Sequence, residues 1–325
     1  MKKSISGRYV SLFAAFVLFF TIGCEMDEPD TLPELSTKPL TNITSKSFAS
    51  GGIIASDGGA IVTARGVCWS TYFNATIDNN FTTDGAGTGS FVSFVTGLEN
   101  GTSYYVRAYA VNSFGIAYGN QIYFTSPLTD IEGNVYNTVI IGTQVWMTQN
   151  LKTTRYYDST AIPKVADNTT WSTLSTPAYC WYKNDESSYK NIYGALYNWF
   201  TINTGKLCPA GWHIPDEEEW TTLFDYLGGL SIASGKLKEE GTIHWRSPNT
   251  GASNAYGFSA LPGGYRTGLS SGSFRTARYY GWWWANTEYD LIRARGNLMT
   301  YDAIEIAKGS GLKTNGYSVR CIKDN

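Results

Sequence analysis

Few residues in this chain have the types and spacing that catalysis requires. There are only two histidines, His213 and His244, and they lie far apart in the sequence. A histidine acts as a general base when a partner group orients it, and a catalytic metal site needs several ligands at suitable spacing. The chain contains neither an HExxH motif nor a CxxC motif. We therefore expect both histidines to be structural, no metal or other cofactor to be required, and the protein not to be an enzyme.

Three consecutive glutamates, Glu217 to Glu219, look like candidate acids and bases in isolation. Asp216 precedes them and Glu219 stands three positions later, which is the pattern of a capping box at the start of a helix. Acidic residues in the first turn interact favourably with the helix dipole. An apolar stripe with helical spacing follows at Trp220, Leu223, Phe224 and Leu227. We predict a helix that begins after Asp216, and glutamates that serve its N-terminus.

Aromatic and basic residues near the end of the chain suit binding better than reaction. Trp282, Trp283 and Trp284 are consecutive, so in a strand they point alternately to its two faces. At least one must pack in the core, whereas an exposed one would offer a stacking surface for a sugar ring. The surrounding segment also holds the following arginines and tyrosines: Arg275, Arg278, Tyr279, Tyr280, Arg293, Arg295 and Tyr301.

The N-terminal segment has the features of a targeting sequence. Basic residues precede an apolar stretch from Tyr9 to Ile22, which is short for a membrane span but suits a signal peptide. A small residue before Cys24 is typical of bacterial lipoprotein processing. We predict that residues 1–23 are a lipoprotein signal peptide and that Cys24 is lipidated. An ordinary secretory signal with an incidental cysteine is the alternative.

Residues 24–38 are acidic and contain two prolines, and we predict a linker there. An acidic run beside a lipidated cysteine resembles the surface-export signal of Bacteroidetes-type lipoproteins. This resemblance implies a lipid-anchored protein of the outer membrane that faces the cell exterior. Several acyl chains would hold it firmly, since each buried methylene contributes about 0.8 kcal/mol.

The composition favours a β-rich extracellular protein. Charged residues make up 16% of the chain and aromatic residues 15%, and the formal net charge is −2. The sequence has no basic patch or stripe, which argues against a nucleic acid as partner. The length allows two domains with proper cores.

The first predicted domain covers residues 39–127 and consists of short strands between turns. Strands are expected at 61–69, 91–95 and 105–111. A tyrosine six residues after a leucine, at the entry to a long strand, is typical of a β-sandwich corner. The stretch resembles a fibronectin type III-like module at Leu98, Gly101, Thr102, Tyr104, Val106 to Ala108, Asn112 and Gly115. The resemblance implies an all-β sandwich that acts as a spacer, with ligand binding by its loops as the alternative.

The second predicted domain covers residues 128–325. Its expected elements are a strand at 139–147 with a turn at Gly142, a short helix around 193–200, the capped helix, a strand and turn over 256–266, and a final strand at 316–321. On that final strand Tyr317, Val319 and Cys321 share one face.

This second domain resembles the Fibrobacter succinogenes major paralogous domain family. The motifs that carry the resemblance are Gly142 to Met147, Asn150-Leu151, Tyr193 to Trp199, Cys208 to Trp220, Gly257 to Tyr265, and Ser318 to Cys321. The architecture of the family is similar to the C-type lectin-like fold of the formylglycine-generating enzymes. It implies an α+β domain with helices around small, twisted antiparallel sheets and with its chain ends close together.

The resemblance also implies a disulfide. In folds of this type a cysteine before the main helix pairs with one that ends the last strand, which corresponds here to Cys208 and Cys321. An exported chain can form such a bond, and closing a loop of this length contributes up to about 4–5 kcal/mol in the chain-entropy model. Cys180 is then unpaired, and a link between Cys180 and Cys208 is the alternative.

The resemblance does not carry a known activity to this chain. Formylglycine-generating enzymes use two closely spaced active-site cysteines, and the cysteines here do not match that spacing. The EPN, QPD and WND runs of calcium-dependent sugar-binding lectins are absent as well. A structural calcium site stays open, because backbone carbonyls can build one without a motif.

We therefore predict a multi-domain, non-enzymatic surface lipoprotein that presents a lectin-like domain to an extracellular glycan or protein ligand. By analogy with lectin-like folds, the candidate ligand-binding residues are the three tryptophans and the late arginines and tyrosines named above. Two alternatives remain: an enzyme or accessory subunit related to the formylglycine-generating fold, and a structural fimbria-like surface component.

Overall fold

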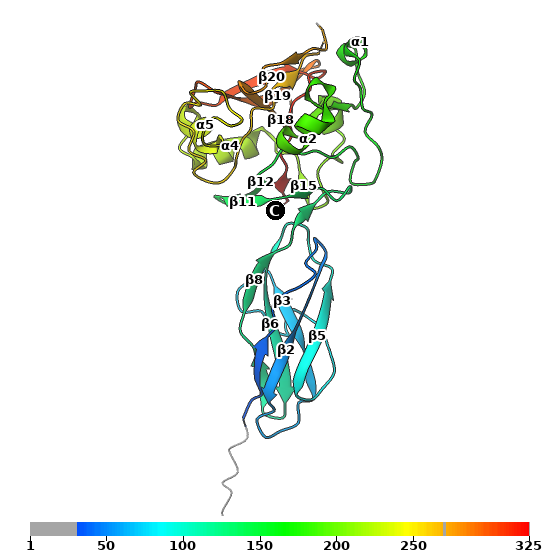
Figure 1. Cartoon of the computed structure of the whole chain (residues 1–325), viewed down its shortest axis with the longest axis vertical. Helices are drawn as coiled ribbons and strands as arrows, with labels where there is room; N and C mark the ends of the chain where they lie inside the picture. Colours follow the sequence, from blue (N-terminus) through cyan, green and yellow to red (C-terminus); the bar gives the residue numbers. More distant parts are fainter. Residues whose placement is uncertain (1–30, 269–270, 325) are drawn as a thin grey trace, which may run out of the picture.

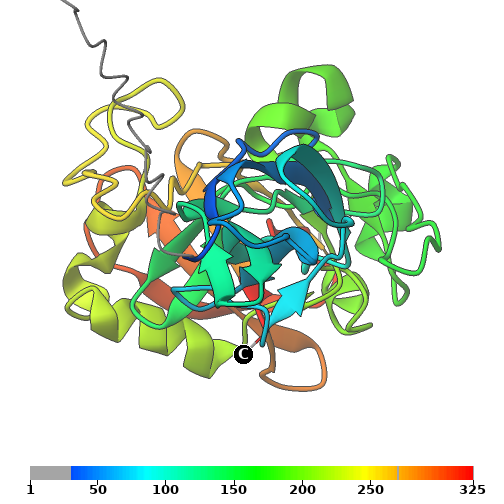
Figure 2. The ribbon, with the colours of Figure 1, turned by 90° about the horizontal axis from the view of Figure 1, so that it is seen from below.

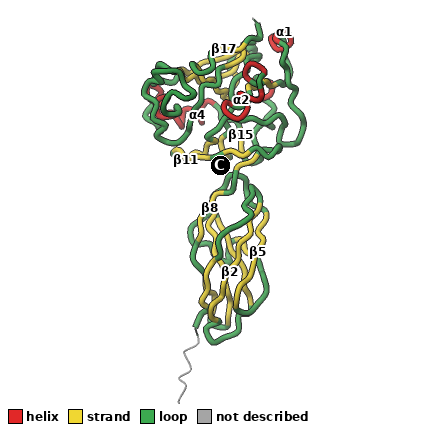
Figure 3. Tube along the Cα trace, viewed as in Figure 1, coloured by secondary structure: helices red, strands yellow, loops and turns green. Residues whose placement is uncertain are grey.

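The computed structural model describes residues 31–268 and 271–324, and it shows an elongated molecule with two parts (Figure 1). A β-sandwich lies at the N-terminal end, and a rounder domain with the described helices lies at the other end (Figure 3). The described chain is mostly strand and loop, with few and short helices. None of the described helices is long and apolar enough to cross a membrane. The predicted signal peptide and the lipidation site at Cys24 lie outside the described residues.

Two antiparallel sheets pack face to face in the first part. One sheet has the order β1–β2–β5, and the other has the order β4–β3–β6–β7, with β8 also paired to β6. Their bounds are β1 Glu34–Thr37, β2 Ser47–Ser56, β3 Ala64–Ser70, β4 Asn80–Phe81, β5 Gly89–Thr96, β6 Ser103–Asn112, β7 Gly115–Tyr118 and β8 Ile122–Thr125. Alternation along the strands builds the core: in β5, Phe91, Ser93 and Val95 are buried between exposed neighbours.

Two predictions for the sandwich have different outcomes. The ring of Tyr104 is buried and its hydroxyl accepts a hydrogen bond from the N–H of Glu99 at 2.9 Å, so the predicted corner is present. The predicted linker is wrong at its end, because Glu34–Thr37 pair with β2 as a strand. The hydroxyl of Thr37 accepts the N–H of Ala108 at 2.9 Å, which ties this strand to the sandwich.

The second part contains two larger sheets. One has the order β11–β12–β21–β15 and faces the sandwich, and the other, β18–β19–β20, lies farther away (Figure 1). Their strands are β11 Thr138–Ile141, β12 Gln144–Met147, β15 Trp212–His213, β18 Tyr280–Glu288, β19 Arg293–Thr300, β20 Ala307–Leu312 and β21 Ile322–Lys323. The short strands are β9 Leu128–Thr129, β10 Val135–Tyr136, β13 Tyr179–Cys180, β14 Leu196–Tyr197, β16 Tyr265–Arg266 and β17 Phe274–Arg275.

Short helices flank these sheets. They are α1 Asn168–Ser172, α2 Glu186–Tyr193, α3 Trp199–Ile202, α4 Glu217–Tyr226 and α5 Leu230–Leu237, with a 3-10 turn at Tyr182–Asn184. Helices α4 and α5 lie on one side of the domain and α2 lies on the other (Figures 1 and 2).

Local sequence accounts for α4, as predicted. The carboxylate of Asp216 accepts the N–H of Glu219 at 2.8 Å, and the carboxylate of Glu219 accepts the N–H of Asp216 at 3.0 Å. This capping box satisfies amide groups that a helix start leaves unpaired. The apolar stripe of α4 is fully buried, and its Trp220 packs against Trp146 of β12 at 4.8 Å between ring centroids.

The predicted helix around 193–200 is wrong. Helix α2 ends at Tyr193, and Gly194 has a φ of 73°, a left-handed conformation that favours glycine. A Cβ at Gly194 would lie 2.6 Å from the carbonyl oxygen of Leu151. The chain then continues as β14 before the single turn of α3. Tertiary burial, and not a helical face, explains the apolar spacing in this segment.

The strand predicted at 316–321 is wrong, and the one predicted over 256–266 is shorter than expected. Of residues 316–321, some make isolated bridges, and the paired strand β21 begins at Ile322. The predicted alternation still holds, because Tyr317, Val319 and Cys321 face one core cluster. Within 256–266 the described strand is β16 alone, at the end of the segment.

Direct contacts join the two parts. The indole N–H of Trp212 donates to the carbonyl oxygen of Asn100 at 3.2 Å, and the ammonium group of Lys323 donates to the hydroxyl of Thr102 at 2.7 Å. The parts approach closely at Gly101, where a Cβ would lie 2.8 Å from the ring of Trp212. The junction is therefore a packed contact and not a bare tether.

Candidate functional site

The predicted tryptophan surface is wrong for two of its three residues. Trp283 and Trp284 of β18 are fully buried. Their indole N–H groups donate to the side-chain oxygen of Asn150 and to the carbonyl oxygen of Tyr197, both at 2.8 Å. Trp282 is half-buried, and its ring stacks on that of Tyr317 with the two ring centroids 4.9 Å apart. The consecutive tryptophans fill the core on both sides of β18.

The predicted arginines and tyrosines do not form one site. The Nε atom of Arg295 lies 3.1 Å from the carboxylate of Glu217 in α4. The Nε atom of Arg293 lies 3.9 Å from the carboxylate of Asp290. These two arginines are therefore compensated by neighbouring carboxylates. Arg275 of β17 is exposed, and Tyr280 at the start of β18 is half-buried.

Arg278 and Tyr279 instead come together with Arg246, which the sequence patterns did not single out. With Thr242 and Ser247 they line a surface pocket of about 290 Å³. The guanidinium group of Arg246 donates to the hydroxyl of Tyr279 at 2.6 Å. Among the described residues, the guanidinium group of Arg278 makes only long contacts, at 3.4 Å, to the carbonyl oxygens of Thr242 and Ile243. Both arginines therefore keep hydrogen-bond donors free for a ligand.

The pocket carries uncompensated positive charge. The side chains of Arg246 and Arg278 are exposed, and within the described residues no carboxylate oxygen lies within 4.0 Å of either guanidinium group. A guanidinium group presents its donors in a planar fork that matches carboxylate, sulfate and phosphate oxygens. The arrangement therefore suits an anionic group.

Backbone contacts and one buried lysine hold this pocket in place. The backbone N–H of Arg246 donates to the carbonyl oxygen of Arg278 at 2.8 Å. The backbone N–H of Tyr301 donates to the carbonyl oxygen of Tyr279 at 2.9 Å. The ammonium group of Lys238 donates at 2.8 to 3.0 Å to the carbonyl oxygens of Thr250, of Thr300 at the end of β19, and of Ala303. Burial lowers the pKa of Lys238 to about 8. Tyr301 is therefore bonded to the pocket through its backbone N–H and does not line it.

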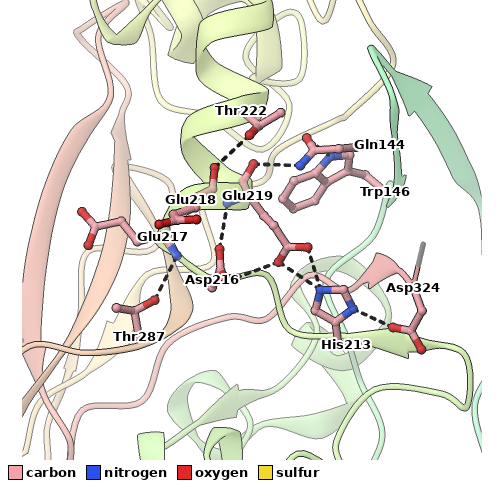
Figure 4. A network of polar contacts seen from close by, with 10 residues as sticks. All are labelled: Gln144, Trp146, His213, Asp216, Glu217, Glu218, Glu219, Thr222, Thr287 and Asp324. Atoms are coloured by element: carbon pink, nitrogen blue, oxygen red, sulfur yellow. Dashed lines mark hydrogen bonds and ion pairs between the residues drawn. The ribbon is translucent and has the colours of Figure 1, made fainter.

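A second polar cluster surrounds His213 (Figure 4). Its ring nitrogens lie 2.8 Å from Glu219 and 2.6 Å from Asp324. The hydrogen bonds to Glu219 and Asp324 raise the pKa of His213 to about 9. Both nitrogens of a protonated histidine are donors, and neither has a lone pair with which to accept a proton. Through its bonds to Glu219 and Asp324, the ring of His213 links β15 to α4 and to the residue that follows β21. This agrees with the structural role expected for it.

The other histidine is bonded in a similar way. His244 lies 2.8 Å from the carboxylate of Glu239 and meets the ring of Tyr193 edge to face. Among residues 31–268 and 271–324, no three side chains of histidine, cysteine, aspartate or glutamate gather as ligands for a metal ion.

Cys208 and Cys321 form a disulfide, which confirms the predicted pairing. The alternative with Cys180 is wrong, because Cys180 is a buried free thiol. Burial raises the pKa of that thiol to about 12, so it is not a reactive thiolate.

Most of the motifs that carry the resemblance to the family meet around the buried Arg320. Its guanidinium group donates to the side-chain oxygen of Asn150 at 3.1 Å and to the carbonyl oxygen of Ser259 at 2.7 Å. The amide group of Asn150 donates to the carbonyl oxygen of Tyr193 at 2.8 Å. Four separated motifs are thereby joined in one buried network, so their residues serve the fold.

These observations define a two-part, mostly β protein in which a sandwich carries a disulfide-closed domain. Residues 139–323 match the family model of the Fibrobacter succinogenes major domain, and the chain belongs to this family.

Comparison with curated proteins gives no match. Many solved structures match parts of the chain, among them the three that follow. The sensor domain of the anti-sigma factor RsgI4 of Pseudobacteroides cellulosolvens is 12% identical over 30% of this chain and 95% of that chain, with a TM-score of 0.24. A fibronectin type III domain of the human KIAA0970 protein is 14% identical over 31% and 79%, with a TM-score of 0.23. The twitchin kinase region of C. elegans is 13% identical over 58% and 32%, with a TM-score of 0.23.

Proposed function

We propose that this protein is a non-enzymatic surface lipoprotein whose second domain binds an anionic group of a glycan or protein ligand. The observation that carries the proposal is the exposed pocket of Arg246, Arg278 and Tyr279, in which neither guanidinium group has a carboxylate within 4.0 Å among the described residues. Arginine stays protonated and donates hydrogen bonds, so it suits recognition rather than proton transfer.

The proposal also assigns a role to each part of the chain. Cys24 carries a lipid anchor in the outer membrane, and the protein faces the cell exterior. The sandwich is a fibronectin type III-like spacer, and the second domain has a C-type lectin-like fold. The elongated arrangement supports this assignment, because the sandwich separates the second domain from the N-terminal end of the described chain (Figure 1).

An array that pairs acidic glycans with neutral counterparts tests the proposal. The acidic members are uronic acid, sialylated and sulfated glycans, and acidic peptides are spotted beside them. The purified protein should bind acidic members, and Arg246→Gln or Arg278→Gln should each weaken binding by about tenfold or more. Binding should also weaken as salt rises, because exposed charges are screened.

Arg155→Gln is the matched control, since Arg155 is an exposed arginine outside the pocket. It should leave binding unchanged. The proposal fails if no acidic glycan or peptide binds, or if binding survives the Arg246→Gln, Arg278→Gln double substitution while thermal unfolding shows that the variant is folded.

A further inference from the structure

A groove of about 950 Å³ runs along the junction between the two parts of the molecule. Tyr72 and Tyr123 of the sandwich line one wall, and Ile140 of β11 lines the other. Their side chains are 79%, 57% and 65% exposed. Exposed apolar side chains are ordinarily scattered, and three that border one groove mark a surface for binding.

Tyr123 also belongs to a row of aromatic rings that crosses the outer face of the sandwich sheet. The ring of Phe73 lies 5.6 Å from that of Tyr105, which lies 5.2 Å from that of Tyr123. Tyr105 of β6 and Tyr123 of β8 are paired in register, so the row runs across the strands and ends in the groove. The phenol of Tyr123 donates to the hydroxyl of Ser103 at 3.0 Å, so hydrogen-bonding groups lie beside the rings.

The charges of the groove are balanced. Lys46 and Lys323 contribute positive charge, and Glu99 and Asp324 contribute negative charge. A nucleic acid or an acidic glycan would require an excess of positive charge. An uncharged ligand complements this lining best, in contrast to the pocket of Arg246.

We propose that the groove and the aromatic row bind a segment of an uncharged polysaccharide. A pyranose ring has a face of C–H groups that packs on the electron-rich face of an aromatic ring. Its hydroxyl groups hydrogen-bond to hydroxyl and amide groups at the edges. A protein partner would instead bury a more apolar central patch. This site is separate from the Arg246 pocket, and the proposal does not rest on the function proposed above.

Isothermal titration of the purified protein with neutral hexasaccharides of glucose, xylose and mannose tests the proposal. At least one should bind, and the double substitution Tyr72→Ala, Tyr123→Ala should weaken binding by about tenfold or more. Tyr123→Phe keeps the ring and should change the affinity by less than about threefold. Phe94→Ala is the matched control, because Phe94 is an exposed aromatic residue on β5 of the other sheet and should have no effect.

Three results would overturn the proposal. The first is no binding of any hexasaccharide at millimolar concentration. The second is binding that is unchanged in the double variant, or that Arg246→Gln weakens equally. The third is a protein ligand whose binding requires both Tyr72 and Tyr123, while the binding of no hexasaccharide requires them. Thermal unfolding establishes that each variant is folded, and Tyr72→Ala alone gives an independent measurement because its ring is largely exposed.

Discussion

Single residues with reactive chemistry are mostly engaged in contacts that hold the fold. His213 lies between Glu219 and Asp324, and the buried Arg320 is satisfied by carbonyl and amide oxygens. The exposed guanidinium groups around Tyr279 differ, because their donors face the surface. The contrast separates the residues that stabilise the domain from those available to a ligand.

Replacement of His213 by glutamine should lower stability in a manner that depends on pH. The pKa of His213 is raised from 6.5 to about 9, first by its hydrogen bond to Glu219. A raised pKa gives stabilisation that is complete below the unfolded-state value and is lost as pH rises through about 9. The Tm difference between the protein and the variant should therefore be larger at about pH 6 than at about pH 10.

The partner carboxylate stays ionised through this range. Burial alone would raise the pKa of Glu219. The hydrogen bonds from His213 and from the N–H of Asp216, with the positive charge of His213, together outweigh burial, so the pKa is lowered. His213 and Glu219 are therefore both charged at about pH 6. An equal Tm difference at both pH values would contradict the prediction.

Lys238→Met should destabilise the second domain by about 2–4 kcal/mol, because it leaves buried carbonyl oxygens unpaired. The methionine retains the length of the side chain but removes the ammonium group that bonds three backbone carbonyl oxygens. Urea unfolding measures the loss. The exposed Lys183 gives the control, and Lys183→Met should change stability by less than about 0.5 kcal/mol. Equal effects of the two substitutions would refute the assigned role.

Elements defined by local interactions could be predicted from the sequence. Helix α4 is specified by its own cap and stripe, and the hairpin of β11 and β12 turns at Gly142, whose φ is 63°. Each depends on residues a few positions apart, so the pattern in the sequence is also the physical cause.

Elements and sites that depend on distant partners could not be predicted in this way. The spacing of residues 193–200 predicts a helix, but α2 ends at Tyr193. Gly194 follows in a left-handed conformation, too close to the carbonyl oxygen of Leu151 for a side chain. The pocket of Arg246 and Arg278 depends on the backbone hydrogen bond between these two residues, which lie far apart in the sequence. The signal available for Arg246 was its place in a turn before a proline, in a chain with few charges.

The disulfide between Cys208 and Cys321 affects the stability of the second domain as a whole. It joins residues 113 positions apart, so removing it frees a long loop in the unfolded chain. The double substitution Cys208→Ala, Cys321→Ala should lower the free energy of unfolding by up to about 4–5 kcal/mol. Denaturant unfolding with and without reductant measures this. Reductant should destabilise the original protein and leave the double variant unchanged, and a protein insensitive to reductant would contradict the prediction.

At the scale of the whole molecule, the relation between the two parts decides whether the groove has a fixed shape. The contacts from Trp212 to Asn100 and from Lys323 to Thr102 cross the junction. They lie beside the wall that Ile140 contributes. A junction held by packing keeps both walls at one spacing, which a preformed binding groove requires.

Two glycines of the sandwich allow this fixed junction to be tested. Gly101 and Gly97 have φ values of 63° and 79°, so alanine at either carries a similar backbone cost of about 1–2 kcal/mol. A Cβ at Gly101 would also lie 2.8 Å from the ring of Trp212, whereas one at Gly97 meets nothing within 4 Å. Gly101→Ala should therefore broaden the distance distribution in small-angle X-ray scattering and weaken hexasaccharide binding, while Gly97→Ala should do neither. If both variants scatter like the original protein, the junction does not depend on this contact.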